Sequence, residues 1–285
     1  MAISKVGVVG CGLMGGGIAQ VVAQSGYATT VVEADQALLD RGLQGIHRSL
    51  DGLVDKGRVS PEQRAAVRSR LSGSLRLEDL GGVDFVIEAI TENPAIKKET
   101  FARLDRICPS HAILASNTSS CTITELAAAT KRPAQVLGTH FFNPAPVMKL
   151  VEVIRTILTG EPAFNAAWMF IQSLGKTPIA AQDTTGFVVN RLLVPYLLEA
   201  VRLLESGVAS KEDIDQAMKL GCGYPMGPFT LLDLVGLDTT LYVAEVMFQE
   251  FREARFAPPP LLRRMVMAGH LGRKSGRGFY EHSAR

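Results

Sequence analysis

His140 and Glu152 are the residues whose types and surroundings most clearly suggest chemistry. His140 follows the short run at 136–139, and Glu152 is the single acid within the apolar run at 150–154. The two prolines between these runs predict a turn. If the runs return alongside each other, the carboxylate can fix the tautomer of the imidazole and support its protonated form, as for a general base. The same pair could instead be a structural histidine and a solvated acid.

A glycine-rich segment follows the first predicted strand, residues 5–9. Gly10 permits a tight turn, Gly12 lets the backbone approach a pyrophosphate, and Gly15 lets the next helix pack closely on the strand. The N-terminus of that helix offers free N–H groups and a positive dipole end to phosphates. This order predicts a dinucleotide-binding loop. Its candidate cofactor-binding residues are Gly10, Gly12, Leu13, Met14 and Gly15.

Glu33 ends the second predicted strand, residues 29–32, at about the 20-residue distance that a dinucleotide-binding unit requires. A carboxylate there accepts hydrogen bonds from the ribose hydroxyls and repels a 2′-phosphate, which favours NAD over NADP. Arg41 could meet a phosphate, so the exclusion of NADP is not absolute. Asp35 is better explained as a residue at a helix start.

The order of the remaining patterns predicts an α/β fold with two domains. Two polar helices are predicted within residues 37–70, as an insertion before the next strand. Further strands are predicted at 84–90, 112–115 and 177–181, separated by helical patterns. From 187 onward the pattern is helical, and the helix predicted at 187–205 is apolar around most of its circumference. We therefore expect a Rossmann-like doubly wound domain at 1–183 with a helical insertion, followed by an all-α domain at 184–285.

Residues 116–120 place hydroxyls and an amide directly after a predicted strand. In open α/β sheets, ligands bind beyond the carboxyl ends of the strands, so these side chains are candidates for a binding site. The alternative is that Ser120 or Thr122 caps the next helix.

Composition excludes several classes of protein. The net charge is +2 and no long block of like charge occurs, which argues against a nucleic-acid or membrane surface. The N-terminus lacks the order of a signal peptide, and no uncharged apolar stretch of about 18 residues predicts a transmembrane helix. The four scattered cysteines are typical of reduced thiols in a cytoplasmic protein. No cysteine or histidine spacing indicates a metal site.

Six segments, in order along essentially the whole chain, resemble the L-3-hydroxyacyl-CoA dehydrogenases, and most closely the bacterial 3-hydroxybutyryl-CoA dehydrogenases. The segments are GCGLMGGGIAQ, LASNTSS, THFFNPAPVMKLVEVI, TTGFVVNR, GYPMGPFTLLDLVGLD and LGRKSGRGFY. The resemblance implies an enzyme that interconverts a (3S)-3-hydroxyacyl-CoA and a 3-oxoacyl-CoA with NAD and that prefers short acyl chains. It also implies a homodimer joined through the helical domains.

The resemblance also assigns roles to residues of the matching segments. His140 is the general base or acid, and Glu152 is its partner. Ser119 hydrogen-bonds the substrate oxygen, and Asn190 completes the site from the second domain. Further cofactor contacts are Glu92, Lys97, Ser119, Asn143 and Lys274. Candidate contacts for the CoA moiety are Ser49, Lys56 and Ser119. Glu33 departs from the family pattern, in which many relatives carry aspartate.

Two other functions remain open from the sequence. A dehydrogenase of free hydroxy acids would share the glycine-rich start, although the segment around His140 argues against it. A catalytically idle NAD-binding structural relative would share the fold, although the presence of Ser119, His140, Glu152 and Asn190 argues against that as well.

Overall fold

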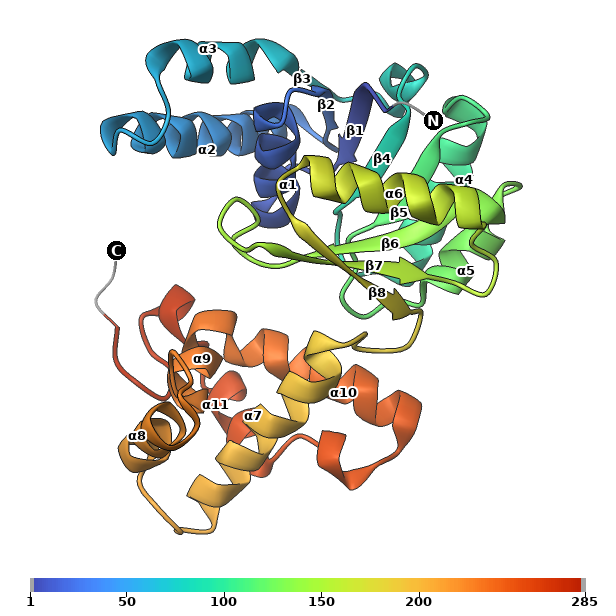
Figure 1. Cartoon of the computed structure of the whole chain (residues 1–285). Helices are drawn as coiled ribbons and strands as arrows, with labels where there is room; N and C mark the ends of the chain where they lie inside the picture. The colour runs from blue at the N-terminus through green and yellow to red at the C-terminus, as the bar shows by residue number, and fades with distance from the viewer. Residues whose placement is uncertain (1–2, 283–285) are drawn as a thin grey trace. The chain divides into compact units, whose positions relative to one another are not determined.

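The computed structural model describes residues 3–282, which form two compact units divided after Thr184. The first unit is built around a β-sheet, and the second is helical (Figure 1). The sequence therefore predicted the fold class correctly. No helix in residues 3–282 is long and apolar enough to cross a membrane.

The sheet of the first unit has the strand order β3-β2-β1-β4-β5-β6-β7-β8. Neighbouring strands are parallel except β6 and β7, which are antiparallel. The strand order reverses between β1 and β4, and such a switch point is where open α/β sheets bind ligands, beyond the carboxyl ends of the strands. The strands are β1 (Lys5–Val9), β2 (Ala28–Val32), β3 (Leu71–Ser74), β4 (Phe85–Glu88), β5 (Ile113–Ser116), β6 (Val136–Phe141), β7 (Leu150–Arg155) and β8 (Thr177–Gln182).

Strand β3 is absent from the sequence prediction, which ran the helical insertion directly to the strand at 84–90. Its sequence, Leu-Ser-Gly-Ser, has one apolar residue and no alternation, and none of its side chains is fully buried. It forms because β2 presents an unpaired edge that it can hydrogen-bond.

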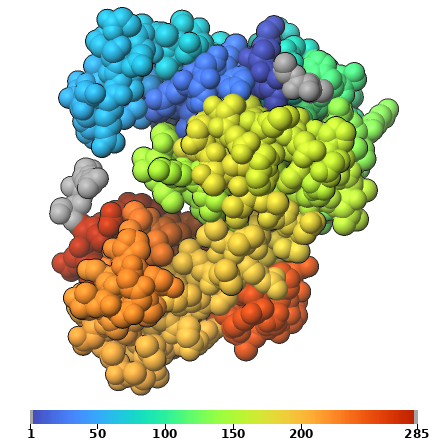
Figure 2. Space-filling view, viewed as in Figure 1, coloured from blue at the N-terminus to red at the C-terminus, as the bar shows by residue number. Residues whose placement is uncertain are grey.

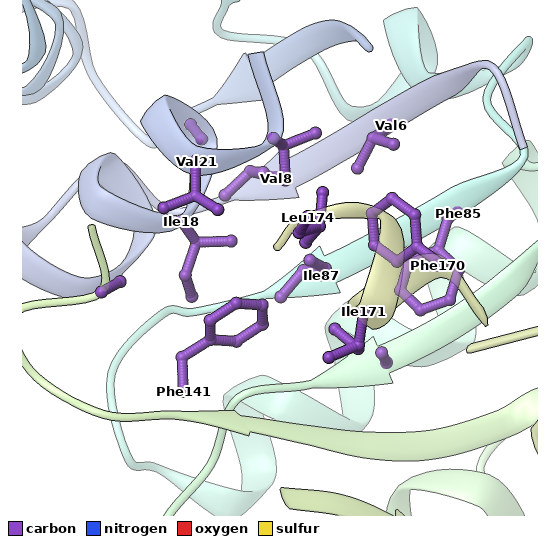
Figure 3. Close-up of a cluster of buried hydrophobic side chains, with 14 of the residues drawn as sticks. Val6, Val8, Ile18, Val21, Phe85, Ile87, Phe141, Phe170, Ile171 and Leu174 are labelled. Atoms are coloured by element: carbon purple, nitrogen blue, oxygen red, sulfur yellow. The ribbon is translucent and has the colours of Figure 1, made fainter. Parts of the chain in front are cut away.

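Helices cover both faces of the sheet (Figure 1). α1 and α6 share one hydrophobic core with the strands, in which the rings of Phe85 and Phe170 lie 4.7 Å apart (Figure 3). α4 and α5 lie on the other face and bury residues such as Phe101 and Ile123 completely. The helices of this unit are α1 (Leu13–Gln24), α2 (Gln36–Asp55), α3 (Pro61–Arg70), α4 (Pro94–Ile107), α5 (Ile123–Ala128) and α6 (Glu161–Ser173), with 3₁₀ turns at η1 (Leu77–Leu80) and η2 (Pro133–Gln135).

Helices α2 and α3 form an arm that projects from the rest of the first unit (Figure 2, light blue). Asp35 caps α2 by accepting a hydrogen bond from the N–H of Leu38 at 2.8 Å. Ser60 and Gln63 form a reciprocal capping box at the start of α3. Both helices were predicted, since their caps and polar faces are local features of the sequence.

Neither Ser120 nor Thr122, the two alternatives from the sequence, caps α5 with its side chain. Thr122 occupies the N-cap position but makes no capping hydrogen bond with its side chain. The carboxylate of Asp183 accepts instead from the N–H of Ile123 at 3.1 Å and of Thr124 at 2.6 Å. A carboxylate is the stronger acceptor at a helix N-terminus because the helix dipole favours negative charge there.

The second unit is a set of helices packed around a core of its own. The predicted helix at 187–205 begins two residues later, because Phe187 has φ of 45° and cannot join a right-handed helix. α7 buries Val194, Leu197 and Val201, whereas Leu192 is 73% exposed. The elements are α7 (Val189–Glu205), α8 (Lys211–Cys222), α9 (Pro228–Val235), α10 (Leu237–Phe251) and α11 (Pro260–Met267), with η3 (Ala254–Phe256) and η4 (Arg273–Ser275).

Candidate active site

The antiparallel register of β6 and β7 places His140 directly opposite Glu152. Both side chains are buried, and Nδ1 of His140 lies 2.6 Å from Oε2 of Glu152. A carboxylate can only accept a hydrogen bond, so Nδ1 carries the proton in this pair. Nε2 is then the atom through which the ring can take up or release a proton.

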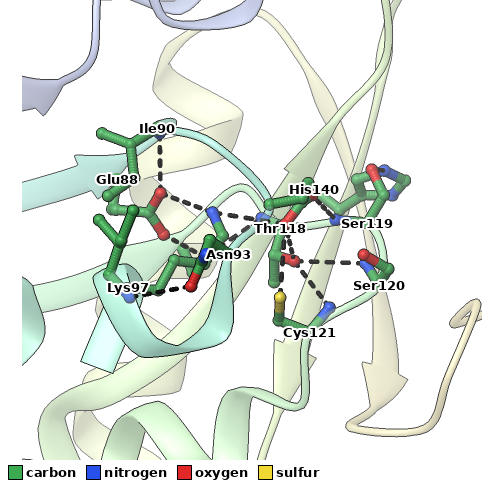
Figure 4. Close-up of polar contacts among 12 residues, drawn as sticks. Glu88, Ile90, Asn93, Lys97, Thr118, Ser119, Ser120, Cys121 and His140 are labelled. Atoms are coloured by element: carbon green, nitrogen blue, oxygen red, sulfur yellow. Dashed lines mark hydrogen bonds and ion pairs between the residues drawn. The ribbon is translucent and has the colours of Figure 1, made fainter. Parts of the chain in front are cut away.

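Ser119 lies at that reactive nitrogen, with its Oγ 3.0 Å from Nε2 of His140 (Figure 4). It reaches this position from the turn after β5. Asn117 at the same strand end accepts a hydrogen bond from the N–H of Phe141 at 2.9 Å, which ties the end of β5 to β6. The structure thus brings three predicted residues, Ser119, His140 and Glu152, into one line of hydrogen bonds.

Glu92 holds the backbone of the Ser119 turn. Its Oε1 accepts from the N–H of Ser119 at 2.8 Å, and its Oε2 accepts from the hydroxyl of Thr118 at 2.7 Å. The ammonium of Lys97 is 1% exposed and contacts Glu92 at 3.5 Å and Glu88 at 2.6 Å. Glu88 was not predicted from the sequence, although an acid at the end of an apolar strand is the same signal that drew attention to Glu33.

The glycine-rich loop follows β1 at the switch point. Gly10 has φ of +96°, and a Cβ there would lie 2.6 Å from the carbonyl oxygen of Ala89. A Cβ on Gly15 would lie 2.0 Å from the carbonyl oxygen of Gly10. Gly12 differs, since nothing lies within 4 Å of its Cβ position. Gly10 and Gly15 therefore allow the loop to form, whereas Gly12 leaves space beside it.

A cavity of about 560 Å³ lies beside this loop in the first unit. Its lining includes the predicted cofactor residues Gly12, Leu13, Glu33 and Asn143, and also Ser49, which was predicted to meet CoA. Arg41 lines the same cavity. The volume, the open space at Gly12 and the acid at the end of β2 fit a dinucleotide.

Glu33 also shapes the loop itself. One carboxylate oxygen accepts from the N–H of Cys11 and the other from the N–H of Ala34, both at 2.7 Å. Burial, together with the charge of Glu33, raises the pKa of the Cys11 thiol to about 11, so this sulfur stays protonated at neutral pH.

The other predicted residues are not among the contacts described above. Met14 packs partly buried against the core of the first unit, and exposed Lys56 forms the C-cap of α2. Asn190 is the second residue of α7, in the other unit. Lys274, also in that unit, pairs with Asp238 at 2.6 Å. No group of His, Cys, Asp and Glu side chains within residues 3–282 has the geometry of a metal site.

Two adjoining family profiles cover the chain. Residues 5–184 match the NAD binding domain of 3-hydroxyacyl-CoA dehydrogenase, and residues 186–282 match its C-terminal domain. The chain belongs to the 3-hydroxyacyl-CoA dehydrogenase family. As in other members of this family, the cofactor of the first domain is NAD.

Individual relatives agree with this assignment. The chain is 50% identical to a 3-hydroxybutyryl-CoA dehydrogenase of Mycobacterium tuberculosis, over 99% of both proteins. It is similar to the crystal structure of FadB2 from M. tuberculosis, with a TM-score of 0.98, 50% identity and coverage of 99% of this chain and 100% of that one. The structure of (S)-3-hydroxybutyryl-CoA dehydrogenase from Ralstonia eutropha gives a TM-score of 0.95 at 45% identity, covering 99% and 100% of the two chains.

We predict that Gly12→Ala weakens NADH binding without destabilising this 3-hydroxyacyl-CoA dehydrogenase. The added methyl meets no protein atom within 4 Å, so the fold has room for it, but it occupies the space through which the backbone would approach the pyrophosphate. The expected Kd for NADH, measured by fluorescence titration, rises by roughly tenfold, which corresponds to about 1.4 kcal/mol.

The matched control is Gly52→Ala on α2. Its Cβ position is equally open, and Gly52 is not part of the cavity lining. This variant should bind NADH as the unchanged protein does. Equal affinity of both variants for NADH would show that Gly12 does not face the cofactor.

Proposed function

We propose that this enzyme acts on short-chain substrates, interconverting (3S)-3-hydroxybutyryl-CoA and acetoacetyl-CoA. The observation that carries the proposed reaction is the continuous line of hydrogen bonds from Glu152 through His140 to Ser119. The relatives named 3-hydroxybutyryl-CoA dehydrogenase support the short acyl chain.

His140 is proposed as the group that exchanges the proton of the reaction. In oxidation, Nε2 takes the proton of the substrate hydroxyl, and Glu152 stabilises the resulting imidazolium through Nδ1. In reduction the same nitrogen returns the proton to the carbonyl oxygen. Bound NAD supplies the acceptor for the hydride that leaves C3 of the substrate.

Ser119 is proposed to position the oxygen that gains or loses this proton. Its hydroxyl lies 3.0 Å from Nε2 of His140, so a substrate oxygen that lies beside both atoms can contact both groups. A donor at this point stabilises negative charge as it develops on the oxygen. We assign Asn190 a similar role from the second domain, on the resemblance of its segment to the family.

The remaining assignments concern the ligands and the two domains. Residues 1–183 are proposed to bind NAD, and residues 184–285 to complete the substrate site and form the dimer. The proposed NAD contacts beyond the glycine loop are Glu33, Glu92, Lys97, Ser119, Asn143 and Lys274. The proposed CoA contacts are Ser49, Lys56 and Ser119. A cytoplasmic location is supported by the four cysteines of the described chain, all of them free thiols.

A single substrate comparison tests the proposed reaction. The enzyme should oxidise NADH in the presence of acetoacetyl-CoA and leave free acetoacetate unchanged, as followed by absorbance at the NADH band. Turnover of the free acid at a comparable rate would favour a dehydrogenase of free hydroxy acids. If NADH is oxidised with neither compound but still binds, the protein is a catalytically idle NAD-binding relative.

We predict that His140→Gln lowers kcat for acetoacetyl-CoA by roughly 10² to 10⁴, the range for loss of a general acid–base group. NADH affinity and the melting temperature should change little, because glutamine can still donate a hydrogen bond to Glu152. The control is His111→Gln. His111 precedes β5 and pairs with Asp84, which precedes β4, so this pair lies at the amino-terminal ends of the strands, opposite the candidate site. A His140→Gln enzyme with near-normal kcat would remove this residue from the mechanism.

A homodimer through the helical domain is supported by apolar surface on that unit. Its large exposed side chains include Leu192 and Leu220, which are 73% and 75% exposed. Apolar surface of this kind commonly marks an interface, and two-fold dimers are the commonest assembly. Light scattering at micromolar concentration should give about twice the 30.7 kDa mass of one chain. A single-chain mass under these conditions would contradict the dimer and leave the enzymatic proposal intact.

A further inference from the structure

The carboxylate of Glu88 is completely buried where β4 ends. Its Oε1 accepts from the ammonium of Lys97 at 2.6 Å and from the N–H of Ile90 at 2.8 Å. Its Oε2 accepts from the hydroxyl of Ser116 at 2.7 Å. One side chain therefore joins the turn after β4, helix α4 and the end of β5 (Figure 4).

A stabilising role in the sheet is a weak explanation for this carboxylate. Taking a carboxylate and an ammonium out of water is costly, and apolar side chains of similar volume commonly give equal or greater stability. The preceding residues of β4, Phe85, Val86 and Ile87, are apolar and fully buried. The charge instead stands at the edge of the sheet where the candidate active site is built.

Two routes of hydrogen bonds lead from Glu88 to the Ser119 turn. In the first, Oγ of Ser116 donates to Glu88 and accepts from the N–H of Thr118 at 3.2 Å. In the second, the ammonium of Lys97 contacts Glu88 at 2.6 Å and Glu92 at 3.5 Å. Glu92 in turn accepts from the N–H of Ser119. Both routes end on the backbone that sets the direction of the Ser119 hydroxyl.

We propose that Glu88 is a positioning residue for Ser119, acting through Lys97 and Glu92 and through Ser116. Glu88 holds the ammonium of Lys97 closer to itself than to Glu92, so that both oxygens of Glu92 remain available to Ser119 and Thr118. Without the charge of Glu88, the ammonium is attracted to Glu92, its remaining carboxylate partner, and Glu92 is drawn away from the turn. The inference rests on the proposed role of Ser119 in catalysis.

The decisive experiment is a double-mutant cycle on kcat with acetoacetyl-CoA and NADH. Glu88→Gln keeps the shape of the side chain and removes its charge. It should lower kcat by about tenfold or more, since small misplacements of a catalytic group have effects of this size. In a Ser119→Ala background the same substitution should lower kcat by less than about twofold, because there is no hydroxyl left to position.

A purely structural role gives a different result, in which the two losses multiply. Asp84→Asn provides the comparison, because Asp84 adjoins the opposite end of β4 and accepts from the N–H groups of Ser4 and Lys5. Burial alone would raise the pKa of Asp84, but these hydrogen bonds and that from His111 lower it to about 2. Its charged form therefore stabilises the fold at neutral pH, and this contribution is lost only as the pH falls toward 2. Asp84→Asn should lower the melting temperature and leave kcat unchanged.

Ser116→Ala decides the matter if Glu88→Gln does not fold. It removes one route and keeps every charge, so it should lower kcat by a smaller factor that also disappears in the Ser119→Ala background. An unchanged kcat in folded Glu88→Gln would overturn the proposal. If Glu88→Gln does not fold, an unchanged kcat in Ser116→Ala would do the same. Losses of kcat that multiply with the loss in Ser119→Ala would also overturn it. An unchanged kcat in Ser119→Ala itself would instead remove Ser119 from the proposed mechanism, which separates failure of that role from failure of the Glu88 proposal alone.

Discussion

The pairing of β6 with β7 is the constraint on which the candidate site depends. These are the only antiparallel neighbours in the described sheet, and their register sets His140 opposite Glu152. Because side chains alternate across a strand, a slip of one residue would turn Glu152 to the other face of the sheet. The 2.6 Å contact between Nδ1 and the carboxylate then fixes which nitrogen of the ring exchanges protons. Chemistry at Nε2 is therefore determined by strand pairing rather than by the histidine alone.

The parallel part of the sheet brings the other groups to the same edge. The glycine loop follows β1, Glu88 ends β4, and the Ser119 turn follows β5. Parallel strands place their carboxyl ends at the same edge of the sheet, so groups that are far apart in the chain are brought to that edge. The cofactor loop and the proton-transfer groups thus share one rigid frame. This arrangement agrees with membership of the 3-hydroxyacyl-CoA dehydrogenase family, whose first domain binds NAD.

Local patterns predicted much of this arrangement from the sequence. The glycine loop, the cap at Asp35 and the strands around His140 and Glu152 all follow from short segments. The missed features depend on partners distant in the chain. Asp183 caps α5 from 60 residues away, and Glu88 meets Ser116 across 28 residues. Strand β3 is too polar to be recognised before β2 offers it an edge, and the backbone angle at Phe187 has no signal in an apolar run.

Cys11 gives the cofactor loop a property unrelated to its geometry. Peroxides and alkylating agents attack the thiolate form of cysteine, and a pKa of about 11 leaves only about one thiolate in ten thousand thiols at pH 7. Burial keeps the pKa of Cys108 equally high, at about 11, and also raises that of Cys121 beside Glu92. An enzyme that uses a redox cofactor thus carries a thiol within its proposed binding loop that is a poor nucleophile toward oxidants at neutral pH. Oxidation of the Cys11 thiol is therefore disfavoured at neutral pH.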